Sequence, residues 1–370
     1  MIRIAQFNAS LSYSHKGELL RCLRARELDP RIQKIAATLQ YVRPDIVMLC
    51  EFDQQADRDD YEALTHFLQR YCHKGHFDLE GISYPHVYLP SSNTGLTLAT
   101  GLRELTSPIL PEDGLGFGCF PGQYNFVFLS KFPIINSEIQ SMQLLKWRSM
   151  PNNAMPQDYY HTAIESQLRL SSKNHVKLVV DINGAPLEFL LCHPTPPVFD
   201  GSERRNYHRN HDEIRLAIDL IDGADYLRDD AGNTISLGRN GPFVLLGDFN
   251  NDAFDGDGDS RIIRELLYHP RVHRQCAVGH RAPRSRGGFY HGMNLQRRGE
   301  HRIGKAAFWT HLKGLRLDYV LPSSEMTVLD SGVFWPDKKQ RFRSWFEDRR
   351  GRQTPTAYSD HRLVWVDVEV

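Results

Sequence analysis

The feature that most constrains this chain is a series of short apolar runs, each bounded by turn residues, that recurs along its length. These runs occupy residues 2–7, 46–52, 126–129, 176–180, 187–192, 243–249, 317–321 and 363–368. Continuous apolar runs of this length are typical of strands that are buried on both faces. The sequence therefore predicts a β-rich protein with large buried sheets, and not a helical bundle.

Three segments combine helical periodicity with a start signal. Asp29-Pro30 provides a capping side chain and a first-turn proline before an apolar stripe. A second helix is predicted to begin near Asn210, because Glu213 follows three residues later as in a capping box. A third is predicted to begin at Ser260. Since strands outnumber helices, we expect the helices to pack on the outside of a sheet system.

The domain organisation is predicted from what interrupts the chain. No repeat, low-complexity tract or Pro/Ser-rich linker divides the 370 residues, which favours a single domain over 1–370, with two domains as the alternative for this length. Segments 101–122 and 194–210 are rich in Gly, Pro, Asp and Asn and are predicted to be long loops. The six cysteines lack CxxC spacing, so we expect mostly reduced core thiols, with one disulfide left open.

The N-terminus lacks the basic and apolar regions of a signal peptide, and no apolar stretch approaches the ~18 residues that span a bilayer. As given, the chain is expected to be cytoplasmic and monomeric, with no membrane span. A trimmed signal peptide would make it secreted or periplasmic instead.

Charge is distributed unevenly, although the formal net charge is zero. Residues 271–352 contain 18 Lys and Arg against 7 Asp and Glu, a net charge of +11, so the rest of the chain carries −11. This asymmetry suits a polyanionic partner such as a nucleic acid. A solvated surface that is merely basic is an equally weighted alternative.

Acidic and amide side chains stand at the ends of several predicted strands. Asn8 directly follows the first apolar run, Glu51 lies inside the second, and Asp248 lies near the end of the run at 243–249, which Asn250 follows. A carboxylate inside an apolar run, as at Glu51, is costly to bury without a partner or a metal. Carboxylate and amide oxygens are hard ligands that suit Mg²⁺, Mn²⁺ or Ca²⁺. The pattern therefore predicts a divalent-metal site at the rim of the sheets.

Taken in order, the motifs resemble the endonuclease/exonuclease/phosphatase superfamily, which includes pancreatic deoxyribonuclease, apurinic endonucleases, inositol polyphosphate 5-phosphatases and sphingomyelinases. The matching segments are Gln6-Phe7-Asn8, Pro44-Asp45 to Glu51, Cys192-His193-Pro194, Gly247-Asp248-Phe249-Asn250, Leu317-Asp318-Tyr319 and Ser359-Asp360-His361. The stretch HPTPPVFDG at 193–201 is similar to a bacterial subgroup. The resemblance implies an α/β fold, a four-layer αββα sandwich with two mixed β-sheets packed face to face and helices outside.

The resemblance also implies a metal centre. Asn8, Glu51 and Asp360 would bind the ion, with Glu51 as the principal ligand. Mg²⁺ or Mn²⁺ is the expected cofactor, and Ca²⁺ is a further candidate.

Catalytic roles follow from the same resemblance. Asp248 would orient or deprotonate the attacking water, and Asn250 would bind a phosphate oxygen. His361 would contact the scissile phosphate, while Asp318 fixes its tautomer. His193 would bind phosphate or protonate the leaving group.

One departure from the deoxyribonuclease-like branch concerns the glutamate that supports the residue equivalent to His193. The corresponding region is Gln123-Tyr124-Asn125 in this chain. The acid role of His193 therefore lacks its usual support, and Tyr124 or Asn125 is expected to contact the phosphate instead.

Further candidates follow the His193 loop or precede Asp318. Arg204, Arg205 and Arg209 are expected to hold substrate phosphate. Trp309 is expected either to join the core or to stack on substrate at the rim.

The predicted function is hydrolysis of phosphodiester bonds by a divalent-metal-dependent, nuclease-like phosphoesterase. A phosphomonoesterase acting on a small phosphate ester or a phospholipid headgroup is the alternative within the enzymes. A catalytically inactive binding module is the alternative outside them, and it would be marked by loss of Glu51, Asp248 or His361, all of which are present.

Overall fold

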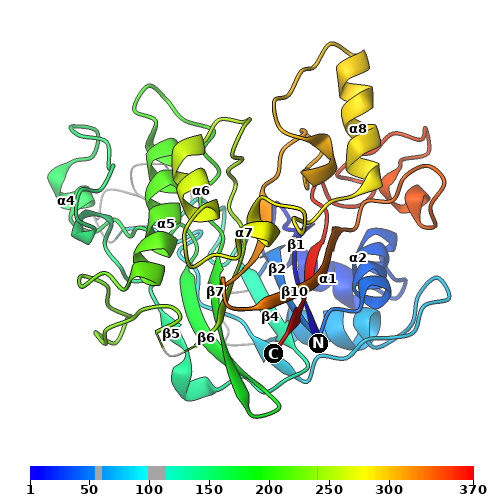
Figure 1. Cartoon of the computed structure of the whole chain (residues 1–370), viewed down its shortest axis with the longest axis horizontal. Helices are drawn as coiled ribbons and strands as arrows, with labels where there is room; N and C mark the ends of the chain where they lie inside the picture. The colour runs from blue at the N-terminus through cyan, green and yellow to red at the C-terminus, as the bar shows by residue number, and fades with distance from the viewer. Residues whose placement is uncertain (55–60, 99–113, 240) are drawn as a thin grey trace.

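A computed structural model of the chain describes residues 1–54, 61–98, 114–239 and 241–370 (Figure 1). Its strands form one sheet of six and one of five. Of the predicted loop at 101–122, residues 101–113 lie outside the described part.

The first sheet has the strand order β10-β11-β1-β2-β4-β3. Its strands are β1 Ile2–Leu11, β2 Ile46–Phe52, β3 His86–Tyr88, β4 Phe126–Ser130, β10 Thr327–Val333 and β11 Val364–Glu369. β1 is parallel to β2 and antiparallel to β11, so the sheet is mixed.

The second sheet has the strand order β5-β6-β7-β8-β9. Its strands are β5 Gln140–Ser141, β6 His175–Ile182, β7 Ala185–Cys192, β8 Phe243–Asp248 and β9 Asp318–Pro322. β7 and β8 are parallel, whereas the other neighbours are antiparallel, so this sheet is mixed too.

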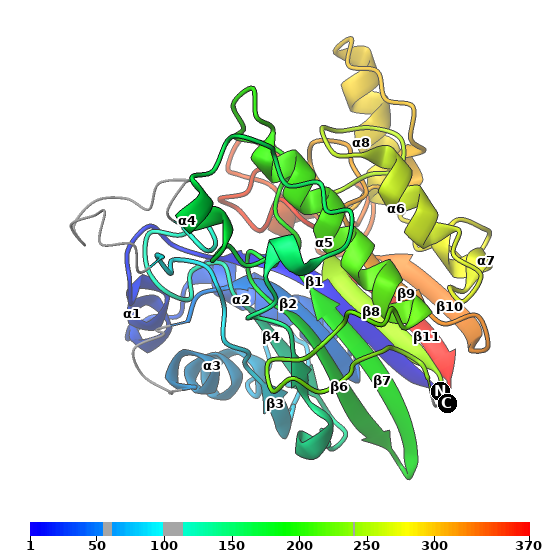
Figure 2. The same ribbon diagram turned by 90° about the vertical axis from the view of Figure 1, so that its left-hand side faces the viewer.

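Helices cover the outer faces of both sheets, as the two views show (Figure 1 and Figure 2). The α-helices are α1 Glu18–Arg24, α2 Pro30–Val42, α3 Glu62–Phe67, α4 Thr162–Glu165, α5 Arg205–Asp222, α6 Ser260–Leu267, α7 Arg274–Ala277 and α8 Arg286–Arg297. Apolar residues of α1 to α3 pack with the outer side of the first sheet. Residues of α5 and α6 pack with the outer side of the second.

A third apolar cluster fills the space between the sheets. Ile4 of β1 belongs to this inner cluster, whereas the next residue, Ala5, belongs to the outer one. The alternation follows from the period of two along a strand, and it explains why these strands are apolar on both faces. The predicted sandwich of two mixed sheets with helices outside is confirmed.

All eight predicted runs are strands, namely β1, β2, β4, β6, β7, β8, β9 and β11. Three strands were not predicted. β3 and β5 have only 3 and 2 residues, and β10 is an edge strand with exposed and part-exposed positions. Short or edge strands need no continuous apolar run, so the sequence pattern does not reveal them.

The helix predictions near Asp29 and Ser260 are confirmed, since the Asp29 carboxylate accepts from the first turn of α2 and α6 begins at Ser260. The predicted start near Asn210 is wrong, because α5 begins five residues earlier, at Arg205. The Asn210 amide donates to backbone carbonyls of other segments, and the Glu213 carboxylate accepts from two loops. These side chains resemble a capping box in sequence but serve long-range contacts.

All six cysteines are free thiols, four of them buried. No helix in the described part of the chain has the length and apolarity that crossing a membrane requires.

Candidate active site

The motif residues converge where the two sheets meet at one end of the sandwich. The Asn8 side chain, on β1, donates to the Glu51 carboxylate on β2 at 3.0 Å and to the Asp248 carboxylate on β8 at 3.0 Å. Since β1 and β8 belong to different sheets, this single amide joins the sheets at the candidate site.

The backbone is irregular at this place. The β1–β2 register shifts between Asn8 and Leu11, and Ser10 and Glu51 have φ angles of 49° and 57°. The left-handed region costs a non-glycine residue of order 1–3 kcal/mol, and such residues cluster at functional sites. Asn250 has a φ of 51° as well. This strain is invisible in the residue pattern.

The Asp248 carboxylate lies at the centre of the cluster and contacts several of its members. Its Oδ2 lies 3.5 Å from His193 Nε2 and 3.7 Å from His361 Nε2, and its Oδ1 accepts from the Asn250 backbone N–H at 2.9 Å. Burial alone would raise the pKa of Asp248, but the neighbouring His361 and His193 lower it below its usual range. Asp248 therefore stays ionised between the two imidazoles.

His361 is held by a second carboxylate. Asp318 lies directly opposite Asp248 in the antiparallel β8–β9 pair, and its Oδ2 accepts from His361 Nδ1 at 2.8 Å. Burial opposes the charged imidazolium, yet the charges of Asp318 and Asp248 raise the pKa of His361 well above its ordinary value. The two carboxylates thus favour the protonated form of His361, whose Nε2 lies 3.7 Å from Asp248 Oδ2.

His193 has the opposite electrostatic character. Burial, reinforced by nearby Lys173, lowers its pKa, and its Nδ1 has no partner among the described residues. Gln123 and Asn125 do not fill this gap, because their amides bond to Tyr13, Cys119, Gln54 and Pro90. The supporting carboxylate missing from the sequence is missing from the described contacts too.

Tyr124 lies at the edge of this cluster. Its backbone N–H donates to the Asp53 carboxylate at 3.0 Å, and its ring stacks on Phe117 with centroids 6.1 Å apart. Burial and the nearby charge of Glu51 raise the pKa of its hydroxyl to about 12, so it remains a neutral donor.

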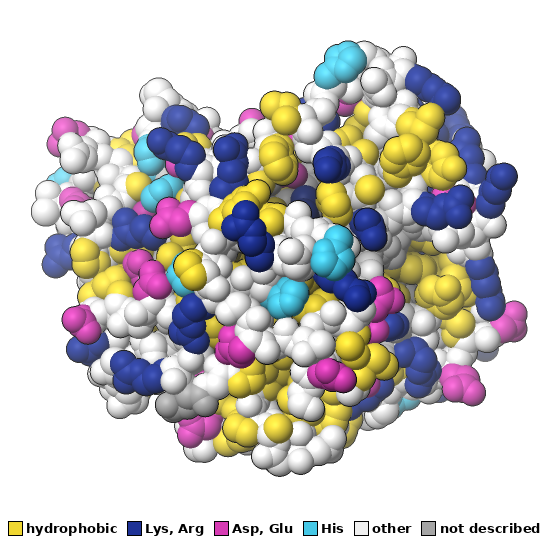
Figure 3. All heavy atoms as spheres, viewed as in Figure 1, with side chains coloured by type: hydrophobic (Ala, Val, Ile, Leu, Met, Phe, Trp, Pro, Cys, Tyr) yellow, Lys and Arg dark blue, Asp and Glu magenta, His cyan; other side chains and the backbone are white. Residues whose placement is uncertain are grey.

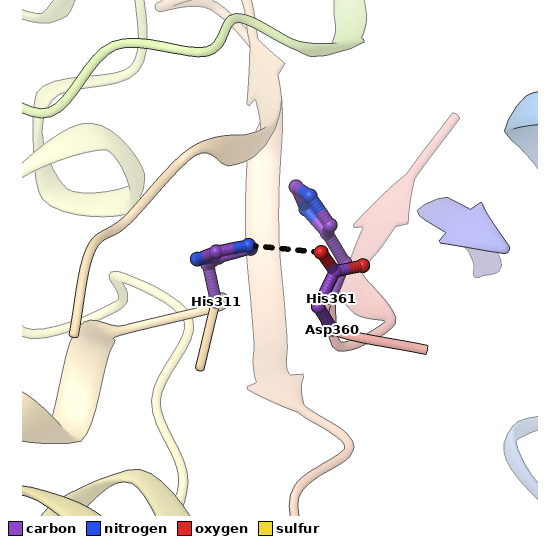
Figure 4. A group of neighbouring side chains, drawn as sticks. All are labelled: His311, Asp360 and His361. Atoms are coloured by element: carbon purple, nitrogen blue, oxygen red, sulfur yellow. Dashed lines mark hydrogen bonds and ion pairs between the residues drawn. The ribbon is translucent and has the colours of Figure 1, made fainter. Parts of the chain in front are cut away.

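Each oxygen of the Asp360 carboxylate has a hydrogen-bond partner. One of the two partners, His311, was not among the predicted site residues. Ser10 Oγ donates to Asp360 Oδ1 at 2.8 Å, and His311 Nε2 lies 3.3 Å from Oδ2 (Figure 4). His311 follows Trp309 in a segment without strand or helix periodicity, so no pattern distinguished it from a core or surface histidine.

Lys173 is a second residue that the sequence analysis missed. Its side chain is buried within electrostatic reach of Glu213, Glu51 and Asp248, and burial lowers its pKa. The available signal was a lysine in the polar stretch just before β6, which is weak because such lysines are usually solvated.

The further candidates Arg204, Arg205, Arg209 and Trp309 contact residues outside the hydrogen-bonded cluster. Arg204 stacks over the Tyr207 ring, Arg205 pairs with Glu203, and the Arg209 guanidinium donates to the backbone carbonyls of residues 115, 169 and 170. Trp309 is 3% exposed and belongs to the core between the sheets, which is the first of the two placements considered for it.

The donor set fits a hard divalent cation. Two groups in the described part of the chain have ligand atoms within 4.8 Å of one another: His311, Asp360 and His361, and Asp248, Asp318 and His361. The carboxylates of Glu51, Asp248, Asp318 and Asp360 outnumber the basic side chains His361 and Lys173, and burial lowers the pKa of Lys173, so an anionic phosphate needs added positive charge here. Glu51 and Asp360 are partly exposed and keep free lone pairs.

Comparison with known proteins identifies the class to which this fold and cluster belong. The profile of the Endonuclease/Exonuclease/phosphatase family matches residues 6–361, so the chain belongs to this family. It is accordingly a metal-dependent hydrolase of phosphate esters. A comparison with curated proteins finds no match.

Solved structures share the fold. An endonuclease/exonuclease/phosphatase from Beutenbergia cavernae is 17% identical, with a TM-score of 0.53 over 100% of this chain and 71% of that one. Sphingomyelinase C from Streptomyces griseocarneus is 14% identical, with a TM-score of 0.48 over 99% and 98%. Truncated TDP2 from Caenorhabditis elegans is 15% identical, with a TM-score of 0.47 over 100% and 98%. The similarity to the Beutenbergia cavernae structure supports a shared fold.

Proposed function

We propose that the protein hydrolyses phosphodiester bonds. The observation that carries this proposal is the placement of two imidazoles of opposite character, His193 and His361, against the single carboxylate of Asp248. Cleaving a diester requires a proton to leave the attacking water and a proton to reach the leaving oxygen. Asp248 would accept the proton of the water, and the protonated imidazole of His361 would supply the proton that reaches the leaving oxygen.

We further propose that Glu51, Asp360 and Asn8 hold the divalent ion. When bound, it would supply positive charge that stabilises the phosphate oxygens. Asn8 presents its amide nitrogen to Glu51 and Asp248, and its Oδ1 accepts from the Ser10 N–H at 3.0 Å, which leaves one lone pair of that oxygen for the ion.

Three further groups would bind and orient the phosphate. The neutral His193 imidazole, the Lys173 amine and the Asn250 amide would lie against its non-bridging oxygens, where negative charge grows in the transition state. Asp248 would hold the attacking water and accept its proton. Asp318 would keep the proton of His361 on Nδ1, leaving the Nε2–H for the phosphate.

A nucleic acid is the proposed substrate class, supported by the net charge of +11 over residues 271–352. A small phosphate monoester or a phospholipid headgroup would need few of these charges. Retention of Glu51, Asp248 and His361 argues against an inactive binding module.

A substrate panel tests the proposal. Purified protein would be assayed with Mg²⁺, Mn²⁺ or Ca²⁺ against plasmid DNA, RNA, bis-p-nitrophenyl phosphate and p-nitrophenyl phosphate. We expect cleavage of the diesters, abolished by EDTA and restored by Mg²⁺ or Mn²⁺. Activity confined to p-nitrophenyl phosphate would replace the diesterase proposal with the monoesterase one, and full activity after exhaustive chelation would refute the metal assignment.

A further inference from the structure

The tautomer of His311 is defined by its neighbours. The backbone N–H of Lys313 donates to His311 Nδ1 at 3.1 Å, so Nδ1 offers a lone pair and carries no proton. The proton of the neutral ring must therefore be on Nε2, the nitrogen 3.3 Å from Asp360 Oδ2. His311 is a hydrogen-bond donor to Asp360.

This tautomer decides what His311 can do near a cation. Nε2 has no lone pair to offer while it carries the proton, and the lone pair of Nδ1 is occupied by Lys313. Although His311, Asp360 and His361 are close enough to hold an ion, His311 is oriented as a partner of the carboxylate and not as a ligand.

The Asp360 carboxylate is held in one orientation by two donors. Ser10 Oγ binds Oδ1 and His311 Nε2 binds Oδ2, one on each oxygen. The side chain of His311 is 7% exposed, whereas that of Asp360 is 34% exposed. Each carboxylate oxygen accepts more than one bond, so the face of Asp360 toward solvent stays free for an ion.

His311 is also fixed to the segment that carries Asp360 and His361. The Leu312 N–H donates to the Asp360 carbonyl at 3.0 Å, and residues 311 and 361 form a backbone bridge. The two imidazole rings meet edge to face, with centroids 4.5 Å apart (Figure 4). One side chain thus touches both a proposed metal ligand and a proposed catalytic residue.

We propose that His311 is a positioning residue that pre-orients the Asp360 carboxylate for the divalent cation. The inference rests on the proposed function in assuming that Asp360 is a ligand. Partners of this kind contribute about 10- to 100-fold to metal affinity, because a rotating carboxylate must be ordered when the ion binds.

Three substitutions separate the contact of His311 with Asp360 from its contact with the Lys313 backbone. In His311→Gln the amide nitrogen reaches as far as Nε2 and keeps a donor for Asp360. In His311→Asn the amide oxygen reaches only as far as Nδ1, so it keeps the Lys313 contact and loses Asp360. His311→Leu removes both contacts.

The measurement is the Mn²⁺ dissociation constant by calorimetry, without substrate, with thermal melts to verify folding. We expect His311→Gln to bind within a few-fold of wild type, and His311→Asn and His311→Leu to bind about 10- to 100-fold more weakly. Wild-type affinity in His311→Asn with weakened binding in His311→Gln would overturn the proposal in favour of a turn-stabilising role. Wild-type affinity in all three variants would overturn it as well.

Two other outcomes would also overturn the inference. A ¹⁴N coupling in the Mn²⁺ electron paramagnetic resonance spectrum that is present in wild type and lost in His311→Gln would make His311 a direct ligand. Failure of wild type to bind Mn²⁺ would remove the metal site itself, and with it this proposal. Binding without phosphodiesterase activity would refute the proposed function while leaving the role of His311 intact.

Discussion

Asp248 is the side chain on which the candidate site converges, since its two oxygens face Asn8, His193, Asn250 and His361. Its charge is what keeps these groups together in a buried place. Replacing it with the isosteric amide preserves shape and removes charge, which makes it the cleanest probe of the chemistry.

We predict that Asp248→Asn and His361→Ala each lower kcat by at least about 100-fold, as expected for groups that act mainly in the transition state. Glu51→Gln should mainly weaken metal affinity, so part of its lost activity should be recovered at high Mn²⁺. Steady-state kinetics at several metal concentrations, with thermal melts as the control for folding, distinguish these cases. Near-wild-type kcat in both folded catalytic variants would show that their assignment is wrong.

The pH dependence should reveal the electrostatic role of Asp318. Burial acts against the imidazolium, and the charges of Asp318 and then Asp248 raise the pKa of His361. In Asp318→Asn the first of these charges is gone, so the pKa of His361 should fall. The alkaline limb of kcat/KM should therefore move to lower pH. An unchanged alkaline limb would mean that His361 does not act as the cation.

The free energy of unfolding should also depend on pH through His361. The pKa of His361 is raised above its unfolded value of about 6.5, so its contribution to stability is fully present below that pH and is lost as the pH rises through the folded pKa. We predict that wild type loses more stability than His361→Gln between pH 6 and strongly alkaline pH. Denaturant titrations across this window, with metal absent, measure the difference.

The sequence predicted the main residues of the cluster, but not all of the side chains that contact them. Asn8, Glu51, Asp248, Asp318 and His361 could be found because each lies in or beside an apolar run. Lys173 and His311 could not, because nothing near them in sequence distinguishes them from solvated or core residues. The backbone strain at Glu51 depends on a register shift between strands far apart in the chain.

At the scale of elements, helix α5 connects two loops that carry proposed phosphate-binding groups. The buried Glu213 carboxylate accepts from the Ser172 N–H at 2.8 Å, next to Lys173, and from the Thr195 N–H at 2.6 Å, two residues after His193. One side chain of the helix thereby holds both loops.

We predict that Glu213→Ala lowers the melting temperature and kcat together. Each unsatisfied buried N–H costs about 1–3 kcal/mol, and both loops would shift. Glu265→Ala, at an exposed position on α6, is the matched control and should change neither. If Glu213→Ala loses stability but keeps full kcat, α5 supports the fold without positioning the site.

Strands that are buried on both faces were predictable, because such burial requires a continuous apolar run in the sequence. The start of α5 was not, because Arg204 adopts a φ of 51° with no side-chain cap, and the polar residues that suggested a later start bond to other segments. Local propensity was overridden by tertiary contacts.

At the scale of the whole molecule, basic side chains are unevenly spread over the surface. Figure 3 shows Lys and Arg along the side where α8 and the segment before β11 lie. Arg349 and Arg350 are exposed, and Arg352 is exposed although paired with Asp348.

We predict that neutralising Arg349, Arg350 and Arg352 together weakens nucleic-acid cleavage and spares p-nitrophenyl esters. Each lost phosphate contact should reduce the salt slope of kcat/KM by about 0.7 to 0.9. Neutralising the exposed Arg21, Arg24 and Arg26 on and after α1 is the control. A flat salt profile on DNA and RNA, or equal loss on both substrate types, would favour a small-molecule phosphatase.

We also propose that residues 1–370 form a single domain, because the two sheets share an apolar cluster and the Asn8–Asp248 contact. Calorimetry should then show one transition, with calorimetric and van't Hoff enthalpies equal. Two resolved transitions would indicate two domains.

The place of β11 has a consequence for synthesis on the ribosome. β11 lies between β10 and β1, so until residues 360–369 emerge, β1 has an unpaired edge that could pair with another chain. The same residues bring Asp360 and His361, so the nascent chain would acquire activity only at the moment when its exposed edge closes.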